Sequence, residues 1–152
     1  MPKVSRTRVI EAPRERVWDL VADPHSLPRW WPRTTRVEDV RGEGARARWT
    51  TVLETERGSP VRADFRCTAS THGERLAWQQ DVAGTPFERV LRSAALEIAL
   101  DAPDGGSTTV RLTSDEALRG LSRLGSSMMR GATKRRLDDA LAAIQLALVG
   151  EP

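Results

Sequence analysis

Hydrophobic and polar residues alternate through the middle of the chain, from about residue 34 to residue 112. The clearest stretch is residues 61–69, in which every odd position is apolar and every even position is polar. This period of two is typical of an antiparallel strand with one buried face and one solvent-exposed face. Comparable patterns predict about seven strands in one curved antiparallel sheet: residues 4–11, 34–40, 45–53, 61–69, 76–82, 96–100 and 110–112.

Two short helical segments interrupt this pattern between the first two predicted strands. Apolar residues recur with helical spacing over residues 13–22, and Pro13 stands where the first turn of a helix tolerates it. The Asp23-Pro24 pair ends this helix. A second, shorter helical turn is predicted over residues 26–30, before Pro32.

The last third of the chain predicts one long helix. Residues 120–149 contain no Pro and are rich in Ala, Leu, Met and Arg, which favours a helix of up to about 29 residues. We expect either a kink near Gly131 or two halves that bury different faces, the first overhanging another part of the molecule and the second packed on the sheet. The reason is that two apolar groups face nearly opposite sides: Leu121, Leu124, Met128 and Ala132 against Leu137, Leu141, Ile144 and Leu148.

Composition and charge describe a single globular domain over residues 1–152. The chain is 39% hydrophobic and 30% charged, which allows a full core and an internal cavity. Its single Cys excludes an internal disulfide, and no apolar run approaches the ~20 residues of a membrane-spanning helix. The N-terminal residues lack the apolar segment of a secretory signal, so we expect a cytoplasmic protein. A net charge of +3 does not require a polyanionic partner.

The order of the predicted elements is similar to the helix-grip fold of the START/Bet v 1-like (SRPBCC) superfamily. Three segments carry a closer resemblance, to the bacterial polyketide cyclase/dehydrase and lipid-transport family: Glu11 to Asp23, Leu27 to Pro32 and Trp78 to Glu88. The resemblance covers about residues 4–150 and implies an α+β fold whose sheet wraps around the long helix, with an apolar cavity between them. It also implies binding or transport of a small hydrophobic, lipid- or polyketide-like molecule, without deciding whether the cavity does chemistry.

Inward-facing positions of the predicted strands and helix supply a candidate lining for this cavity. A small-molecule pocket needs apolar and aromatic walls and a few polar groups that orient the ligand. The same side chains would also form an ordinary core, but small residues beside bulky Trp, and unbranched Met on the facing helix, favour a cavity. The predicted ligand-binding residues are Trp30, Trp49, Thr51, Phe65, Cys67, Trp78, Gln80, Leu96, Ile98, Val110, Leu124, Met128 and Met129. Trp30 and Trp31 fit either an entrance or the packing of the short helices.

We assign no catalytic residue from the sequence. His25 and His72 fall in predicted loops, and Cys67 falls in the most regular strand, where we expect a buried thiol of ordinary pKa. One Cys and two distant His do not make a zinc site, and no phosphate- or dinucleotide-binding Gly pattern occurs, so we expect no metal or cofactor. A polyketide aromatase/cyclase-type enzyme is the alternative. It would need inward-facing charge, and four charged residues have an undecided orientation: Arg6, Arg8, Glu11 and Asp81.

A second alternative is a protein- or nucleic-acid-interaction module. Residues 117–137 carry basic residues and no acid, and on an ideal helix four of them share a 60° stripe: Arg119, Arg123, Arg130 and Lys134. The stripe is also explained by an ordinary solvated face. No aromatic residue is interleaved, which argues against nucleic acid. If residues 34–40 form an edge strand, pairing between two copies would give a homodimer.

Overall fold

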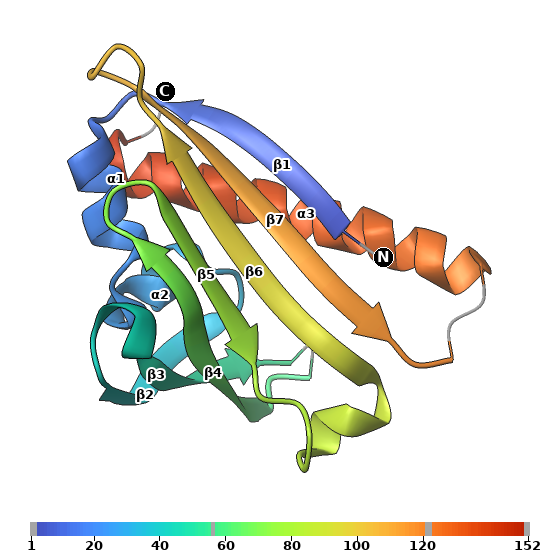
Figure 1. The fold of residues 1–152 in the computed structure, drawn as a ribbon. Helices are drawn as coiled ribbons and strands as arrows, with labels where there is room; N and C mark the ends of the chain where they lie inside the picture. The colour runs from blue at the N-terminus through green and yellow to red at the C-terminus, as the bar shows by residue number, and fades with distance from the viewer. Residues whose placement is uncertain (1–2, 56, 121–122, 151–152) are drawn as a thin grey trace.

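The computed structural model describes residues 3–55, 57–120 and 123–150, with the backbone alone for residues 123 and 124. One curved antiparallel sheet curls around a long C-terminal helix, and two short helices lie at one end (Figure 1). The strands lie in the order β1-β7-β6-β5-β4-β3-β2. This arrangement confirms the predicted α+β helix-grip architecture.

The elements follow the order that the sequence predicts. The strands are β1 (Lys3–Ile10), β2 (Thr34–Arg41), β3 (Arg48–Glu54), β4 (Pro60–Thr71), β5 (Arg75–Gln80), β6 (Leu91–Asp101) and β7 (Thr108–Leu118). The α-helices are α1 (Arg14–Val21), α2 (Leu27–Trp30) and α3 (Arg123–Leu148), and three short 3-10 turns are η1 (Pro24–Ser26), η2 (Gly44–Arg46) and η3 (Pro86–Arg89). No helix among the described residues is both long enough and apolar enough to span a membrane.

Several details of the strands differ from the sequence prediction, and both β6 and β7 are longer than predicted. Residues 44–46 form a 3-10 turn, so β3 begins at Arg48 and not at residue 45. A β-bulge between Cys67 and Ala69 breaks the strict alternation of β4, and Ala69 and Ser70 are both half-buried. β5 ends at Gln80, and Val82 is buried in the loop that follows.

The first strand pairs with the last one. In this antiparallel ladder Val4 lies opposite Ser114, and the hydroxyls of Ser5 and Thr113 are 2.7 Å apart. Thr108, at the start of β7, donates a 2.8 Å hydrogen bond to the carbonyl oxygen of Ala12 and so fixes the chain just before α1. β1 and β2 are the two edges of the sheet, as expected for residues 34–40.

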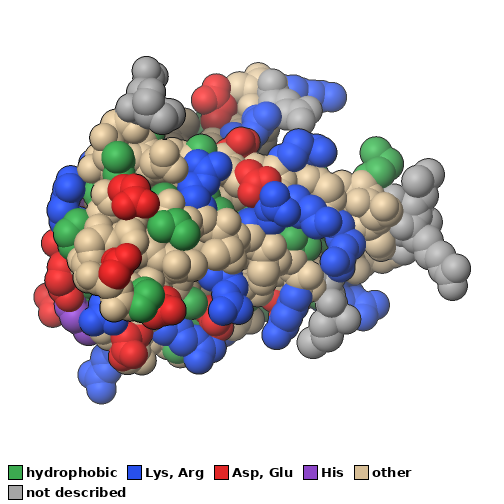
Figure 2. All heavy atoms as spheres, turned by 90° about the horizontal axis from the view of Figure 1, so that it is seen from above, with side chains coloured by type: hydrophobic (Ala, Val, Ile, Leu, Met, Phe, Trp, Pro, Cys, Tyr) green, Lys and Arg blue, Asp and Glu red, His purple; other side chains and the backbone are tan. Residues whose placement is uncertain are grey.

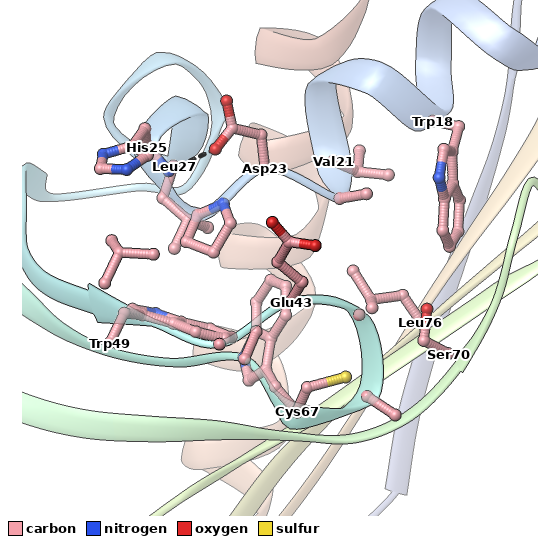
Figure 3. A pocket seen from close by; sticks show the side chains of 18 of the residues that line it. Trp18, Val21, Asp23, His25, Leu27, Glu43, Trp49, Cys67, Ser70 and Leu76 are labelled. Atoms are coloured by element: carbon pink, nitrogen blue, oxygen red, sulfur yellow. Dashed lines mark hydrogen bonds between the residues drawn. The ribbon is translucent and has the colours of Figure 1, made fainter.

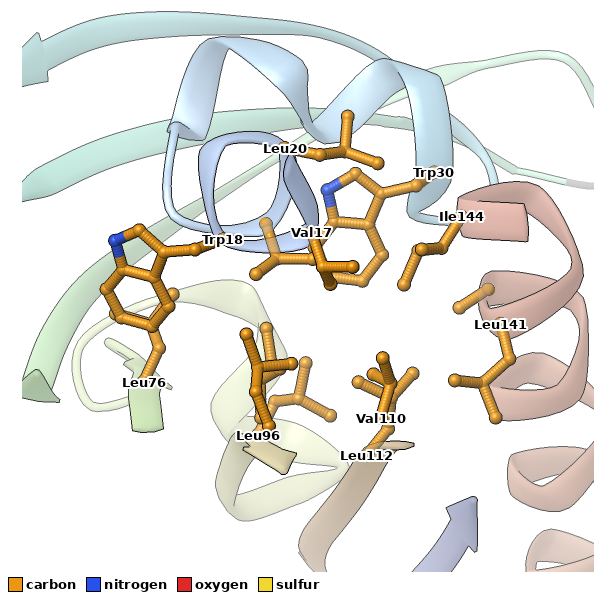
Figure 4. Packing of buried hydrophobic residues seen from close by; sticks show 14 of the residues in the cluster. Val17, Trp18, Leu20, Trp30, Leu76, Leu96, Val110, Leu112, Leu141 and Ile144 are labelled. Atoms are coloured by element: carbon orange, nitrogen blue, oxygen red, sulfur yellow. The ribbon is translucent and has the colours of Figure 1, made fainter. Parts of the chain in front are cut away.

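The C-terminal half of α3 anchors the helix. Leu137, Ala140, Leu141 and Ile144 are almost fully buried, and α3 contacts α1, α2 and β1. Figure 4 shows Leu141 and Ile144 facing Trp30 and the strand residues Val110 and Leu112 across the core. The larger set of buried core residues spans β1, the short helices and the inner face of the sheet, and it includes Val17, Leu20, Leu96 and Ile98.

The N-terminal half of α3 corrects the predicted position of its apolar face. The helix is a single segment through Gly131, and Leu121 and the side chain of Leu124 lie outside the described residues. Met128 is 67% exposed and Ala132 is also exposed, whereas Met129 is half-buried and Thr133 is buried. Met129 and Thr133 continue the buried side that begins at Leu137, so the described side chains of α3 bury one face and not two opposite faces.

Candidate ligand-binding cavity

Three adjoining cavities lie between the N-terminal half of α3 and the concave face of the sheet. Their volumes are about 540, 510 and 100 Å³, and the two larger values fall in the range of small-molecule pockets. They share lining residues in pairs: Trp31, Leu53 and Arg136; Ser114 and Glu116; Met129 and Thr133. We refer to the three together as the helix–sheet channel and to the smallest as its inner cavity.

The wall of the inner cavity is set by the register of the sheet. Trp78 lies opposite Cys67 on one side and Leu96 on the other, and Leu96 lies opposite Ser114. In the next row Gln80 lies opposite Phe65, and Ala94 lies opposite Glu116. Inward-facing residues of neighbouring strands therefore form rows across β4 to β7, which is how alternation along single strands becomes one continuous wall.

An ion pair bridges α3 and β7 inside the channel. Arg136 Nη2 donates a close hydrogen bond to Glu116 Oε1, which also accepts a 3.2 Å hydrogen bond from the buried hydroxyl of Ser114. The side chain of Glu116 is only 18% exposed and that of Arg136 is 36% exposed. Both residues line the inner cavity, so the ion pair forms part of its wall.

A further cavity lies outside the channel, between η1 and the loop that joins β2 to β3. Its volume is about 670 Å³, which is larger than each part of the channel. Figure 3 shows Glu43 lying between Trp49 and Trp18, with Asp23 on the side of η1 and Cys67 on the sheet below. We call it the loop cavity.

Trp78 separates the loop cavity from the channel. It is 5% exposed and lines both the loop cavity and the inner cavity. Its ring contacts three other indoles, those of Trp30, Trp31 and Trp49, with centroid distances of 5.6 to 6.2 Å. These rings fill the space between α2 and the sheet and keep the two spaces apart.

One protein-family model matches this chain over most of its length. The model of a family described as polyketide cyclase/dehydrase and lipid transport matches residues 1–148, almost the whole chain. The chain belongs to this family. No protein with a curated description matches the sequence.

Solved structures with the same fold include enzymes of polyketide biosynthesis and other proteins of the superfamily. The di-domain ARO/CYC BexL from the BE-7585A biosynthetic pathway has a TM-score of 0.78 at 22% identity; the match covers 100% of this chain and 48% of BexL, so the chain spans about half of that protein. Zhui aromatase/cyclase from Streptomyces sp. R1128 has a TM-score of 0.76 at 18% identity, covering 94% of this chain and 90% of Zhui. A START superfamily protein from Mycobacterium smegmatis has a TM-score of 0.77 at 13% identity, covering 96% of both chains.

Seven of the thirteen predicted ligand-binding residues of this polyketide cyclase/dehydrase family member line one or both of the two spaces. Phe65, Trp78, Gln80 and Leu96 line the inner cavity, and Met129 lines the two larger parts of the channel. Trp49 and Cys67 line the loop cavity, together with Trp78. Four others are buried without lining any of these cavities: Trp30, Thr51, Ile98 and Val110. Trp30 is 1% exposed and packs the short helices, whereas its half-buried neighbour Trp31 lines the channel.

Two predicted residues on α3 do not join the lining. The expectation that Met128 faces the sheet is wrong, because its side chain is 67% exposed. Leu124 lies outside the residues whose side chains the structure describes. The adjacent Met129 lies 100° around the helix from Met128 and takes the expected place.

The sequence analysis missed the charged pair of the channel. Glu116 continues the inward-facing series of β7 after Val110, Leu112 and Ser114, but the predicted strand stopped at residue 112. Arg136 was grouped with the other basic residues of 117–137. Extending the period of two by four residues would have found Glu116.

The other charged candidates lie away from the channel. Arg6 pairs with Asp138 at 2.8 Å, Arg8 reaches Gln145, and Glu11 is exposed. Asp81 lies within 4 Å of Arg48 and Arg66. Within the described chain, no group of three or more His, Cys, Asp and Glu side chains is arranged to hold a metal ion.

Cys67 and the two histidines show no arrangement for nucleophilic catalysis. Burial raises the pKa of the Cys67 thiol, so the expectation of an ordinary pKa is wrong, and the reactive thiolate is disfavoured. The imidazole of His72 is largely exposed and lies 3.3 Å from a carboxylate oxygen of Glu15. His25 is exposed on η1.

The basic stripe is only partly a helix face. Arg119 precedes α3 and donates a 2.9 Å hydrogen bond to the carbonyl oxygen of Glu88, and the side chain of Arg123 lies outside the description. Arg130 and Lys134 are exposed on α3. Figure 2 shows Lys and Arg side chains gathered in the right-hand half of the view, whereas Asp and Glu side chains are more frequent on the left.

Proposed function

We propose that this chain binds a small hydrophobic, lipid- or polyketide-like ligand in the helix–sheet channel. The observation that carries the proposal is the set of adjoining spaces of about 540, 510 and 100 Å³ between the N-terminal half of α3 and the sheet. Their walls combine apolar residues such as Trp31, Leu53 and Met129 with polar and charged residues, most of them in the two larger cavities. Apolar walls that bury a ligand, with polar groups that orient it, are typical of ligand pockets. Membership of the family supports the same role.

A matched pair of variants tests this location. Met129 lines two parts of the channel, whereas the adjacent Met128 points to solvent. Met129→Trp fills the channel and Met128→Trp does not, although the change in size is the same. We expect the uncharged fluorescent probe N-phenyl-1-naphthylamine to bind wild type and Met128→Trp equally, and to bind Met129→Trp at least about tenfold more weakly, a loss of ~1.4 kcal/mol.

A third variant separates the channel from the loop cavity. Ala45 lines the loop cavity and is exposed on the loop between β2 and β3. If Ala45→Trp weakens probe binding while Met129→Trp leaves it unchanged, the ligand site is the loop cavity and the proposed location is wrong. Circular dichroism and the unfolding midpoint of each variant establish that it is folded.

A cyclase-type reaction is the second candidate, favoured by the ion pair inside the channel. Aldol cyclisation needs a base for the proton of an activated carbon and a donor to the carbonyl oxygen that receives charge. Glu116 would take the proton, and an N–H of Arg136 would donate to the oxygen as the new C–C bond forms. The alkoxide then regains a proton, so the ring closes without an outside oxidant or reductant.

The enzyme hypothesis predicts a difference between turnover and binding. A poly-β-ketone thioester incubated with the protein should give a cyclised product faster than in buffer, detected by mass and absorbance. Glu116→Gln should lower this rate by about 10²-fold or more while N-phenyl-1-naphthylamine still binds. A rate equal to that in buffer for wild type rules out this reaction for the substrate used and leaves the binding role.

A further inference from the structure

Gln80 carries an unpaired amide nitrogen in the wall of the inner cavity. Gln80 is only 8% exposed, and its Nε2 has no hydrogen-bond partner. The residue lines the inner cavity. An amide has a donor end and an acceptor end, so either orientation of the group presents polar atoms to the cavity. A buried polar group without a partner has lost its hydrogen bonds to water and gained none in the protein, so it destabilises the empty cavity. This cost is removed when a bound molecule supplies the missing partner.

Arg136 adds a second unpaired donor to the same cavity. Its Nη2 is engaged by Glu116, but its Nε is buried and has no partner. Gln80 and Arg136 both line the inner cavity, whose volume is only about 100 Å³. The two residues that carry these unpaired N–H groups therefore line a space that accommodates a group of a few atoms.

The charges around the inner cavity cancel. Arg136 and Glu116 are its only ionisable lining residues among those described, and they form an ion pair. A carboxylate placed here would face Glu116 as well as Arg136 and would lose its hydration without a free positive charge to compensate. An uncharged oxygen acceptor satisfies both donors without this cost.

We infer that the ligand of the channel presents an uncharged carbonyl oxygen, as in an aryl ketone or a quinone, to Gln80 and Arg136. This inference rests on the proposed function and adds the chemical class of the ligand and the residues that select it. Gln80 and Arg136 act as specificity-determining residues, and the apolar walls of the channel hold the remainder of the molecule.

Three competitors of nearly equal size test the inference. 2-Acetylnaphthalene carries a carbonyl, 2-isopropenylnaphthalene replaces the carbonyl oxygen with a CH₂ group, and 2-naphthoate carries a charged carboxylate. Each is titrated against bound N-phenyl-1-naphthylamine. In wild type we expect the ketone to displace the probe at about tenfold lower concentration than the alkene, and also at lower concentration than the carboxylate.

Variants of two adjacent glutamines locate the effect. Gln80→Leu should reduce the ketone preference over the alkene from about tenfold to about one. Gln79→Leu is the matched control, because Gln79 is half-buried on the other face of β5, where its amide oxygen accepts a hydrogen bond from Arg66, and the preference should remain. If Gln80→Leu does not fold, Gln80→Met provides the same test with a side chain of similar length.

Removing the charge of Glu116 tests whether the balanced charges of the inner cavity disfavour a carboxylate ligand. Glu116→Gln leaves the positive charge of Arg136 uncompensated in the cavity, so 2-naphthoate should become a better competitor than the ketone. Unchanged selectivity in this variant would contradict the charge argument.

The possible results separate this inference from the proposed function. If the probe binds wild type but the ketone and the alkene compete equally, or the carboxylate competes best, the carbonyl inference is wrong and the binding role stands. If the probe does not bind wild type at all, the proposed function fails, and the inference fails with it. Loss of the preference in Gln79→Leu as well as in Gln80→Leu would also overturn the assignment to Gln80.

Discussion

The indole rings of Trp78 and Trp49 meet edge to face, with their centroids 5.6 Å apart and an interplanar angle of 88°. Trp49 in turn stacks on Phe65, with an interplanar angle of 10°. Both indoles line the loop cavity, but Trp78 alone of the two also lines the inner cavity of the channel. One side chain thus serves as the partition between two spaces with different linings.

Removing this partition should be costly. Trp78→Ala deletes a side chain that is 95% buried and leaves a void next to two existing cavities, so we expect a loss of about 3–5 kcal/mol in the free energy of unfolding. For a chain of this length that is a decrease in Tm of the order of 10 °C. Urea and thermal denaturation measure both. Val90→Ala, at an exposed position, is the control with an expected change within about 0.5 kcal/mol; an equally small effect of Trp78→Ala would contradict its position in the structure.

The two halves of α3 should differ sharply in their contribution to stability. Leu141→Ala removes a side chain that is 1% exposed, and we expect a loss of about 2–5 kcal/mol. Met128→Ala removes a side chain that is 67% exposed, and the expected change is within about 0.5 kcal/mol. Chemical denaturation of the two variants compares them directly. A large loss in Met128→Ala would mean that the N-terminal half of α3 is packed and would remove the channel.

The same difference explains why the sequence predicted one half of the helix and not the other. Leu137, Leu141 and Ile144 must be buried for the helix to dock, so their spacing reports the buried face. In the N-terminal half the buried side is continued by Met129 and Thr133, whereas the equally apolar Met128 is exposed. The apolar residues of this half therefore did not indicate the buried face. Following the buried stripe backwards by four residues at a time from Leu137 leads to Thr133 and Met129, which do line the channel.

The strands were easier to predict than the contents of the site. Alternation alone placed Trp78 and Gln80 on the inner face of β5, because one face of an antiparallel sheet must be apolar. It gave no information on whether an inward-facing residue contacts its neighbours or borders a cavity. Ile98 and Val110 are fully buried in the core, whereas Leu96 on the same face of the sheet borders a cavity. That distinction depends on how far α3 stands from the sheet, which no local pattern encodes.

The Cys67 thiol should react slowly in the folded protein. Burial raises its pKa, so the thiolate is scarce near neutral pH, and access to the side chain is restricted. We expect alkylation by iodoacetamide at pH 8 to be at least about tenfold slower than in the urea-unfolded chain. The neutral thiol is favoured by the fold, so its contribution to stability is constant below the ordinary pKa of about 8.5 and decreases as the pH rises above it. Equal alkylation rates in the folded and unfolded protein would show that Cys67 is accessible.

Two glycines of the loop between β2 and β3 should respond differently to Ala. Both have positive φ, 71° at Gly42 and 56° at Gly44, which costs a non-Gly residue roughly 1 kcal/mol or more. A Cβ at Gly42 would also overlap the carbonyl oxygen of Arg46, whereas a Cβ at Gly44 would meet no atom within 4 Å. We therefore expect Gly42→Ala to lower the unfolding midpoint clearly more than Gly44→Ala. Because Gly42 lines the loop cavity, a small and equal effect of both would mean that this loop rearranges freely.

The pairing of β1 with β7 has a consequence for the newly made chain. Every other neighbouring pair of strands is consecutive in the sequence. Each of the strands β3 to β7 is therefore able to pair with the strand made just before it as the chain leaves the ribosome. β1 is translated first but finds Ser114 and Thr113 only after about a hundred more residues have been added. Its edge thus stays open throughout elongation, and the earliest strand to emerge is among the last to be protected from pairing with other chains.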